Sequence, residues 1–189
     1  MSELEHYIQS FFGVEKEDLQ KMASLFQVDH VKRGDFYLKT GRPCDKLSFI
    51  RSGLLRIFVQ TDDKEVTQWI SSKGYFVTDL AALTFEKPAR WNIQALNDVE
   101  LYTISGRDYH QIGQLIPKWY QLEKLFIAKC FTMLEDRIFS HLCMSAEKRY
   151  QAFYAQNKEL FQQVPLQYIA SMLGMTPETF SRIRKKELM

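Results

Sequence analysis

The chain has 189 residues, with 25 lysines and arginines against 23 aspartates and glutamates, and 46% of it is hydrophobic. These values are typical of one or two small folded domains, and they exclude a disordered or collagen-like chain. No apolar run reaches the roughly 18 residues that a membrane span requires, and the acidic start is unlike a signal peptide. Three widely spaced cysteines favour a reducing compartment, so we expect a cytoplasmic protein without disulfides.

The positive charge is concentrated at the C-terminal end of the chain. Residues 147–189 have a net charge of +3, whereas residues 1–146 have a net charge of −1. Four of the basic side chains fall within Arg182–Lys186. A local cluster of this kind is a candidate contact for nucleic acid even when the net charge of the whole chain is small.

Short strands separated by turns are expected between Gly34 and Gly106. Apolar and polar residues alternate most clearly in 55–60 and 65–70. The residues expected to share one face of these two strands are Leu55, Ile57 and Val59 in the first and Val66, Gln68 and Ile70 in the second. The other expected strands are 36–40, 47–51, 74–77, 91–96 and 99–104. Short strands at this spacing predict a sandwich or jelly-roll-like sheet domain.

A long amphipathic helix is expected over residues 108–143, with about seven turns following Pro117. Its apolar residues recur at spacings of three and four. The residues predicted to form the seam of a helix pair between two copies of the chain are Trp119, Leu122, Phe126, Cys130 and Met133. The alternative is that this stripe packs only on the sheet of its own chain. A further helix is expected from the N-cap Ser145 to about Asn157.

Residues 164–186 predict two short helices joined by a three-residue turn. Pro165 suits a first helical position, and the apolar face expected on the first helix is Leu166, Ile169, Ala170 and Leu173. Gly174 suits the left-handed residue that ends this helix, and Thr176 followed by Pro177 suits the start of the second. With Phe180 and Ile183 pointing to the same core, the pattern predicts a helix-turn-helix.

The outer face of the second helix has side chains suited to the major groove of DNA. Glu178 can accept from a cytosine amino group, and Arg182, one turn later, can donate to guanine O6 and N7. Arg184, Lys185 and Lys186 can neutralise phosphates. The predicted DNA-binding residues are Thr176, Pro177, Glu178, Thr179, Ser181, Arg182, Arg184, Lys185 and Lys186. The alternative is a solvated helical hairpin in which Glu178 and Arg182 pair with each other.

From about Leu25 to Lys186 the sequence resembles the cyclic AMP receptor protein/fumarate–nitrate regulator (CRP/FNR) family of transcription factors. The resemblance rests on Lys32–Phe36, Cys44–Gly53 and Gly74–Phe76 in the sheet region and on Glu178-x-x-Ser-Arg182 in the second short helix. It implies a homodimer joined through the long helix, which binds a two-fold DNA operator. RNA polymerase is a candidate further partner.

The sequence departs from this family where its members bind the phosphate of a cyclic nucleotide. By resemblance, Asp79 takes the place of a glutamate that binds the ribose, whereas the expected arginine falls on Ala89, with Arg90 one place out of register. A one-residue slip in an extended segment reverses the direction of a side chain. Cyclic AMP is therefore not expected, and no cofactor is predicted with certainty. A pocket for another small-molecule effector is predicted at Phe76, Asp79, Leu80, Ala89 and Arg90.

Metal and catalytic sites receive little support from the sequence. The cysteines Cys44, Cys130 and Cys143 are too few and too dispersed for the four thiolates of an iron–sulfur cluster. Haem ligation by one of the four histidines (His6, His30, His110 and His141) stays open as an alternative. A glycine-rich phosphate loop, a metal-spaced His/Cys set and a Gly-x-Ser-x-Gly elbow are all missing, so an enzyme is not expected.

We therefore predict an α+β protein with three parts. They are a β-roll sensor domain with short N-terminal helices in 1–107, a long dimerisation helix in 108–143 and a helix-turn-helix domain in 144–189. The predicted function is a dimeric, sequence-specific DNA-binding regulator that reads a two-fold operator with 177–186. The alternative is a ligand-sensing module that contacts another protein and has no role on DNA.

Overall fold

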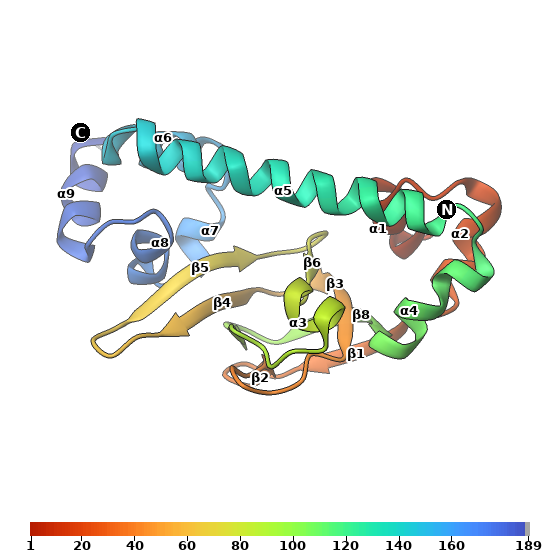
Figure 1. The fold of residues 1–189 in the computed structure, drawn as a ribbon. Coiled ribbons are helices and arrows are strands. Elements are labelled where there is room, and N and C mark those ends of the chain that lie inside the picture. The colour runs from red at the N-terminus through yellow and green to blue at the C-terminus, as the bar shows by residue number, and fades with distance from the viewer. Residues whose placement is uncertain (188–189) are drawn as a thin grey trace.

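The computed structural model describes residues 1–187. The chain forms a sheet domain under a long helix, with a group of short helices at one end of that helix (Figure 1). The helices are α1 (Glu3–Phe12), α2 (Lys16–Ala23), α3 (Leu80–Phe85), α4 (Gly106–Leu115), α5 (Trp119–Cys143), α6 (Ala146–Gln156), α7 (Leu160–Gln163), α8 (Leu166–Met172) and α9 (Pro177–Glu187). The predicted α+β architecture is confirmed.

Antiparallel strands form two four-stranded sheets within the described residues. The strands are β1 (Gln27–Val31), β2 (Phe36–Leu38), β3 (Lys46–Ser52), β4 (Leu55–Gln60), β5 (Glu65–Ser71), β6 (Phe76–Val77), β7 (Asn92–Ala95) and β8 (Val99–Ser105). One sheet has the order β1-β8-β3-β6 and the other has the order β2-β7-β4-β5. The sequence predicted seven of these strands, although some are shorter than expected. It missed β1 and the helices α3 and α7.

The β4–β5 hairpin, which projects from the sheets toward α8 (Figure 1), is buried on both faces. Leu55 and Ile57 pack into the core of the sheet domain, whereas Arg56 and Ile70, which pair across the hairpin, face the C-terminal helices. The predicted alternation in 65–70 is interrupted because Gln68 has no partner where the register shifts between Ile57 and Phe58. A bulge of this kind changes which side chains lie on each face.

Residues 108–143 form part of two helices and not one continuous helix. α4 ends at Leu115 and α5 begins at Trp119, because proline at position 117 cannot donate the hydrogen bond that a helix interior requires. The ring of Tyr120 then lies so close to Gly113 that a Cβ atom there would be 2.8 Å from it. After this break, α5 continues for 25 residues, which is the length expected after Pro117.

The predicted dimer seam on α5 faces the interior of the same chain. Trp119 and Phe126 are each only 1% exposed, and both lie against Phe12 of α1. Leu122 and Cys130 pack beside them, while Met133 is exposed. The prediction of this seam was wrong for the buried residues, and the alternative, that the stripe packs within its own chain, describes them.

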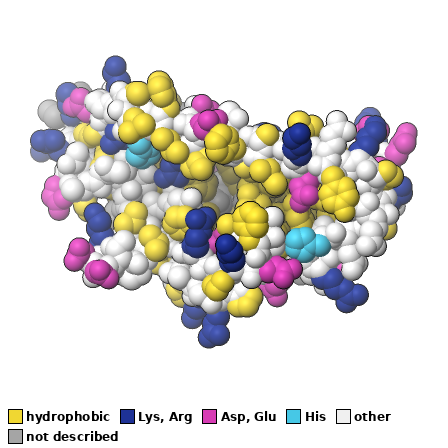
Figure 2. Space-filling model, viewed as in Figure 1, with side chains coloured by type: hydrophobic (Ala, Val, Ile, Leu, Met, Phe, Trp, Pro, Cys, Tyr) yellow, Lys and Arg dark blue, Asp and Glu magenta, His cyan; other side chains and the backbone are white. Residues whose placement is uncertain are grey.

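A different row of apolar side chains on α5 is exposed. This row, called the outer stripe, consists of Tyr120, Ile127, Phe131, Leu134, Ile138 and Leu142. Their spacings of seven, four, three, four and four place them on one side of the helix. Figure 2 shows hydrophobic side chains gathered along the helix that spans the molecule. No helix of the described part of the chain is both long enough and apolar enough to cross a membrane.

The C-terminal helices have a core of their own, and the sheet domain contributes to it. Phe180, Ile169 and Tyr150 are buried in this second core. Leu54 and Ile70, from the sheet domain, are buried in the same cluster, each 3% exposed. The predicted boundary at 143–144 therefore separates two helices, α5 and α6, but it does not separate two independent cores.

Candidate nucleic-acid interface

Helices α8 and α9 form the predicted helix-turn-helix from local signals in the sequence. Gly174 has a φ of +68°, so it adopts the left-handed conformation that ends α8. The hydroxyl of Thr176 accepts from the backbone N–H of Thr179 at 3.2 Å, and α9 begins at Pro177. Ala170 is fully buried, which allows the two helices to approach closely. Pro165 lies just before α8 and not at its first position.

Helix α9 has one buried face and one exposed face. Phe180 and Ile183 are buried in the second core. The exposed side chains on the other face are Pro177, Glu178, Ser181, Arg182 and Lys185. Among the ion pairs of residues 1–187, none joins Glu178 to Arg182. Hydrogen bonds from its own backbone N–H and from Thr176 lower the pKa of Glu178, so this carboxylate stays ionised and available as an acceptor.

Other predicted DNA-binding residues of α9 are already engaged within the domain. Thr176, just before the helix, caps it by accepting from the backbone N–H of Thr179. Lys186 lies 3.3 Å from a carboxylate oxygen of Glu147 in α6, although its side chain remains mostly exposed. Arg184 is half-buried. The exposed face is the one predicted, and it centres on Glu178 and Arg182.

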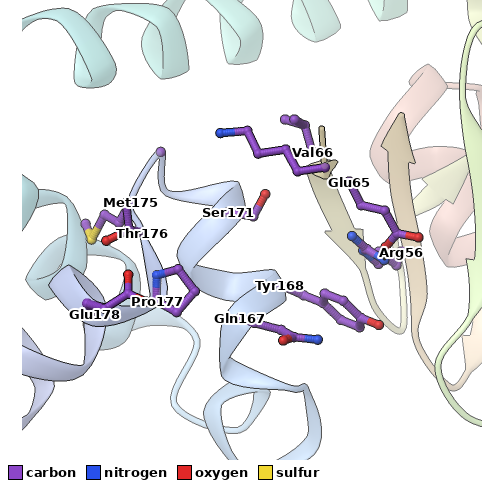
Figure 3. A pocket seen from close by; sticks show the side chains of 12 residues that line it. Arg56, Glu65, Val66, Gln167, Tyr168, Ser171, Met175, Thr176, Pro177 and Glu178 are labelled. Atoms are coloured by element: carbon purple, nitrogen blue, oxygen red, sulfur yellow. Dashed lines mark hydrogen bonds and ion pairs between the residues drawn. The ribbon is translucent and has the colours of Figure 1, made fainter. Parts of the chain in front are cut away.

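A cavity of about 740 Å³ lies between the β4–β5 hairpin and the helix-turn-helix (Figure 3). Arg56 and Glu65 line it on the hairpin side, and Tyr168 extends toward them from α8. Pro177 and Glu178, at the start of α9, line the opposite side. The sequence did not predict that the β4–β5 hairpin lies beside the helix-turn-helix. An arginine between apolar residues in 55–60 was the available signal for a buried charge.

The predicted effector pocket is held together by its own backbone. Asp79 is 2% exposed. One of its carboxylate oxygens accepts from the N–H of Ala82 at 3.1 Å and caps α3, while the other accepts from the N–H of Arg90 at 2.9 Å. The N–H and carbonyl of Ala89 bond to the turn at Gly41–Arg42. These hydrogen bonds hold residues 79–90 against each other and against the turn at Gly41–Arg42.

The residues at this place do not fit a cyclic nucleotide. Asp79 is turned into the fold, so it was wrongly predicted to be available to a ribose hydroxyl. Ala89 is buried and has no guanidinium to pair with a phosphate, and the guanidinium of Arg90 lies over the ring of Trp91 at 5.8 Å. Phe76 packs edge-on against Phe126 of α5, and Leu80 borders the same core. The predicted residues thus make packing contacts and backbone hydrogen bonds within the fold.

Metal-binding groups are dispersed. Within residues 1–187, no three histidine, cysteine, aspartate or glutamate side chains gather as metal ligands would. Cys44 is buried beside the hydroxyl of Thr78, and Cys143 is exposed. Burial raises the pKa of the Cys130 thiol to about 11, which keeps it protonated and weakly nucleophilic.

Comparisons with known proteins agree with this architecture. Residues 28–114 match the family model described as the cyclic nucleotide-binding domain. A search of the curated proteins finds no match.

Three solved structures are similar over most of the chain. FixK2 from Bradyrhizobium japonicum has a TM-score of 0.72 at 13% identity, covering 85% of this chain and 83% of that one. A CooA mutant from Carboxydothermus hydrogenoformans has a TM-score of 0.67 at 18% identity, covering 95% and 83%. The catabolite activator protein of Thermus thermophilus has a TM-score of 0.58 at 23% identity, covering 98% and 86%. Residues 28–114 therefore match the cyclic nucleotide-binding domain model, and the chain as a whole has the same fold as FixK2, CooA and the catabolite activator protein.

Proposed function

We propose that the protein is a sequence-specific DNA-binding regulator that acts as a homodimer and inserts α9 into the major groove. The observation that carries this proposal is the exposed face of α9. Glu178 and Arg182 lie one helical turn apart, both exposed and not paired with each other, on a helix anchored by Phe180 and Ile183. A helix fixed on one side, with an acceptor and a bidentate donor on the other, suits direct reading of base edges.

The proposed roles follow from the chemistry of each side chain. Glu178 accepts from a cytosine amino group, and Arg182 donates to guanine O6 and N7. Lys185 and the half-buried Arg184 neutralise backbone phosphates, and Lys186 does so in exchange for its contact with Glu147. Phosphate contacts fix the position of the helix, whereas the two reading residues supply the preference for particular bases.

The homodimer is proposed to form through the outer stripe of α5. An exposed apolar row on a 25-residue helix is costly to leave in water, and a second copy of the same row covers it under two-fold symmetry. Such a dimer would place its two α9 helices on the same side of the dimer. This arrangement suits two half-sites about one helical turn of DNA apart. Because the Asp79 carboxylate is occupied by backbone N–H groups and Ala89 has no guanidinium, we propose that control does not depend on cyclic AMP.

Selection of binding sites from random DNA by the full-length protein tests this function. We expect an enriched motif with two-fold symmetry. Arg182→Ala should relax the preference at one base pair in each half-site, at a cost of about 1–3 kcal/mol per contact. Lys185→Ala is the control, because loss of a phosphate contact should weaken binding to all sequences alike and reduce the dependence on salt.

Two outcomes would count against the proposal. If Arg182→Ala weakened all sequences equally, the residue would not read bases. If the wild-type protein enriched no motif, the alternative of a protein-interaction module without DNA binding would be favoured.

A further inference from the structure

The β4–β5 hairpin holds α8 through a buried arginine. Arg56 is 2% exposed, and its guanidinium lies 3.6 Å from the centre of the Tyr168 ring of α8. It also lies 4.2 Å from the Phe58 ring, donates to Thr67 at 2.9 Å and pairs with Glu65. A guanidinium placed over aromatic rings and bonded at its edge has little freedom to move.

A hydrogen bond between β5 and α8 and the burial of Ile70 reinforce this contact. The N–H of Thr67 in β5 donates to the hydroxyl of Ser171 in α8 at 2.9 Å. Ile70, two positions beyond the bulge at Gln68, is buried in the core of the C-terminal helices. The hairpin is therefore a part of the surface on which α8 rests.

A second arginine connects α5 to the same place. The guanidinium of Arg137 donates to the carbonyl of Met172, at the end of α8, at 3.1 Å. It also lies 5.1 Å from the centre of the Trp69 ring in β5. Burial lowers the pKa of Arg137. Arg137 lies on the proposed dimer helix, and its side chain contacts both the sheet domain and the helix-turn-helix.

The link between α5 and α6 is also fixed. Arg149 donates to the carbonyl of Met144, in the link, at 2.7 Å and to the carbonyl of Leu173, in the turn before α9, at 3.0 Å. The helix-turn-helix is thus held at its connection as well as along α8. The reading face is not held in this way, because the cavity shown in Figure 3 separates Glu178 from the hairpin.

We infer that Arg56 and Arg137 are positioning residues that fix both helix-turn-helix units relative to the dimer helix, and so determine which spacing between half-sites is bound. This inference rests on the proposed function. Neither residue lies on the exposed face of α9. They set the distance and the angle between the two copies of α9. Each base pair inserted between half-sites rotates them by about 34–36° around the DNA axis, so a rigidly held pair accepts few spacings.

The test compares the wild-type protein with the double variant R56M/R137M. Methionine keeps much of the buried volume and introduces no buried charge, and Glu65 remains partly exposed to water, so the variant is expected to fold. The matched control is R51M/R90M, which removes two arginines that do not contact the C-terminal helices. Circular dichroism confirms the folding of both variants.

Binding is measured on the selected operator, on copies with one or two base pairs added or removed between the half-sites, and on a single half-site. We expect the wild type and the control to bind the altered spacings at least about 10-fold more weakly than the selected one. In R56M/R137M this ratio should fall to about 3-fold or less, while the base preference within the half-site is kept. An unchanged ratio, or an equal loss on every DNA including the half-site, would overturn the inference.

A measurement without DNA separates this inference from the proposed function. Spin labels on Ser181→Cys, in a Cys143→Ser background, report the distance between the two copies of α9 in the dimer. A narrow distribution in the wild-type background that broadens in R56M/R137M supports the positioning role even if no DNA motif is found. A distribution that stays equally narrow in the variant contradicts it.

Discussion

Asp79 illustrates how a single residue that resembles a ligand contact is used by the fold. Its two carboxylate oxygens accept backbone N–H groups from both sides of the cassette. Asp79→Ala should therefore lower the free energy of unfolding by about 2 kcal/mol, because it removes a helix cap and leaves a second buried N–H without an acceptor. Chemical denaturation measures this loss, and Asp79→Asn, which retains one acceptor, should lose less. A cyclic AMP-induced rise in Tm that disappears in Asp79→Ala would show that the residue binds ligand.

Glu3 gives a prediction about pH. It accepts from Lys73 at 2.8 Å, from Tyr7 at 3.0 Å and from Tyr102 at 3.3 Å, and the Lys73 contact is the largest cause that lowers the pKa of this carboxyl. Because the pKa is lower in the folded state, the stabilisation is present above the unfolded value of about 4.3 and is lost as pH falls through the folded value.

Glu3→Gln should therefore lower the free energy of unfolding by about 0.5 kcal/mol at pH 7, a small effect because the carboxylate is partly exposed to water, which screens its ion pair. Urea titrations at pH 7 and pH 3 measure it, and the difference between the variant and the wild type should be smaller at pH 3. A difference of the same size at both pH values would show that charge is not the cause.

Residues whose role depends on neighbours in sequence could be predicted, and residues whose role depends on distant segments could not. Gly174 and Thr176 were assigned correctly because a left-handed helix end and a helix cap need only the adjacent backbone. Asp79 was assigned to a ligand because its real partner, the N–H of Arg90, is eleven positions away. Arg56 was not noticed, since its burial depends on Tyr168.

At the scale of elements, most of the residues that the sequence predicted as a dimer seam on α5 lie on the face of the helix that packs inward. The helix has two apolar rows: Trp119 and Phe126 lie in the chain's own core, whereas the outer stripe is exposed. Periodicity alone cannot decide which of two apolar rows packs inward, because both recur at helical spacing. The N-terminal helix α1 decides it, since Phe12 covers Trp119 and Phe126.

The outer stripe therefore gives a prediction for α5. Phe131 lies near the middle of the outer stripe, and its side chain is 59% exposed. Phe131→Glu should raise the dissociation constant of the dimer by at least about 30-fold, because it places a carboxylate in an apolar interface. Phe139→Glu, on another exposed side of the same helix, should leave dimerisation unchanged. Sedimentation equilibrium measures both. The outer stripe would not be the interface if Phe131→Glu remained as dimeric as Phe139→Glu.

At the scale of the whole molecule, the sheet domain and the helix-turn-helix should unfold together. Leu54 and Ile70 belong to the sheets but are buried with Phe180 and Ile169. Ile70→Ala should lower the free energy of unfolding by about 2–5 kcal/mol, since it opens a cavity in a core that both parts share. The effect should reach both parts, because Leu54 and Ile70 of the sheet domain complete the core of the C-terminal helices.

Hydrogen exchange followed by mass spectrometry measures this coupling. In Ile70→Ala, amides of α8, α9, β4 and β5 should lose protection by the same free energy. The matched control is Ile104→Ala, which creates a similar cavity in the first core, away from the helix-turn-helix. Because the two parts are expected to unfold together, its cost should appear in α9 as well as in the sheets, and a cost confined to the sheets would show that they unfold separately. If Ile70→Ala left the protection of α8 and α9 unchanged, the helix-turn-helix would be stable alone. The hairpin would then contact its core without completing it.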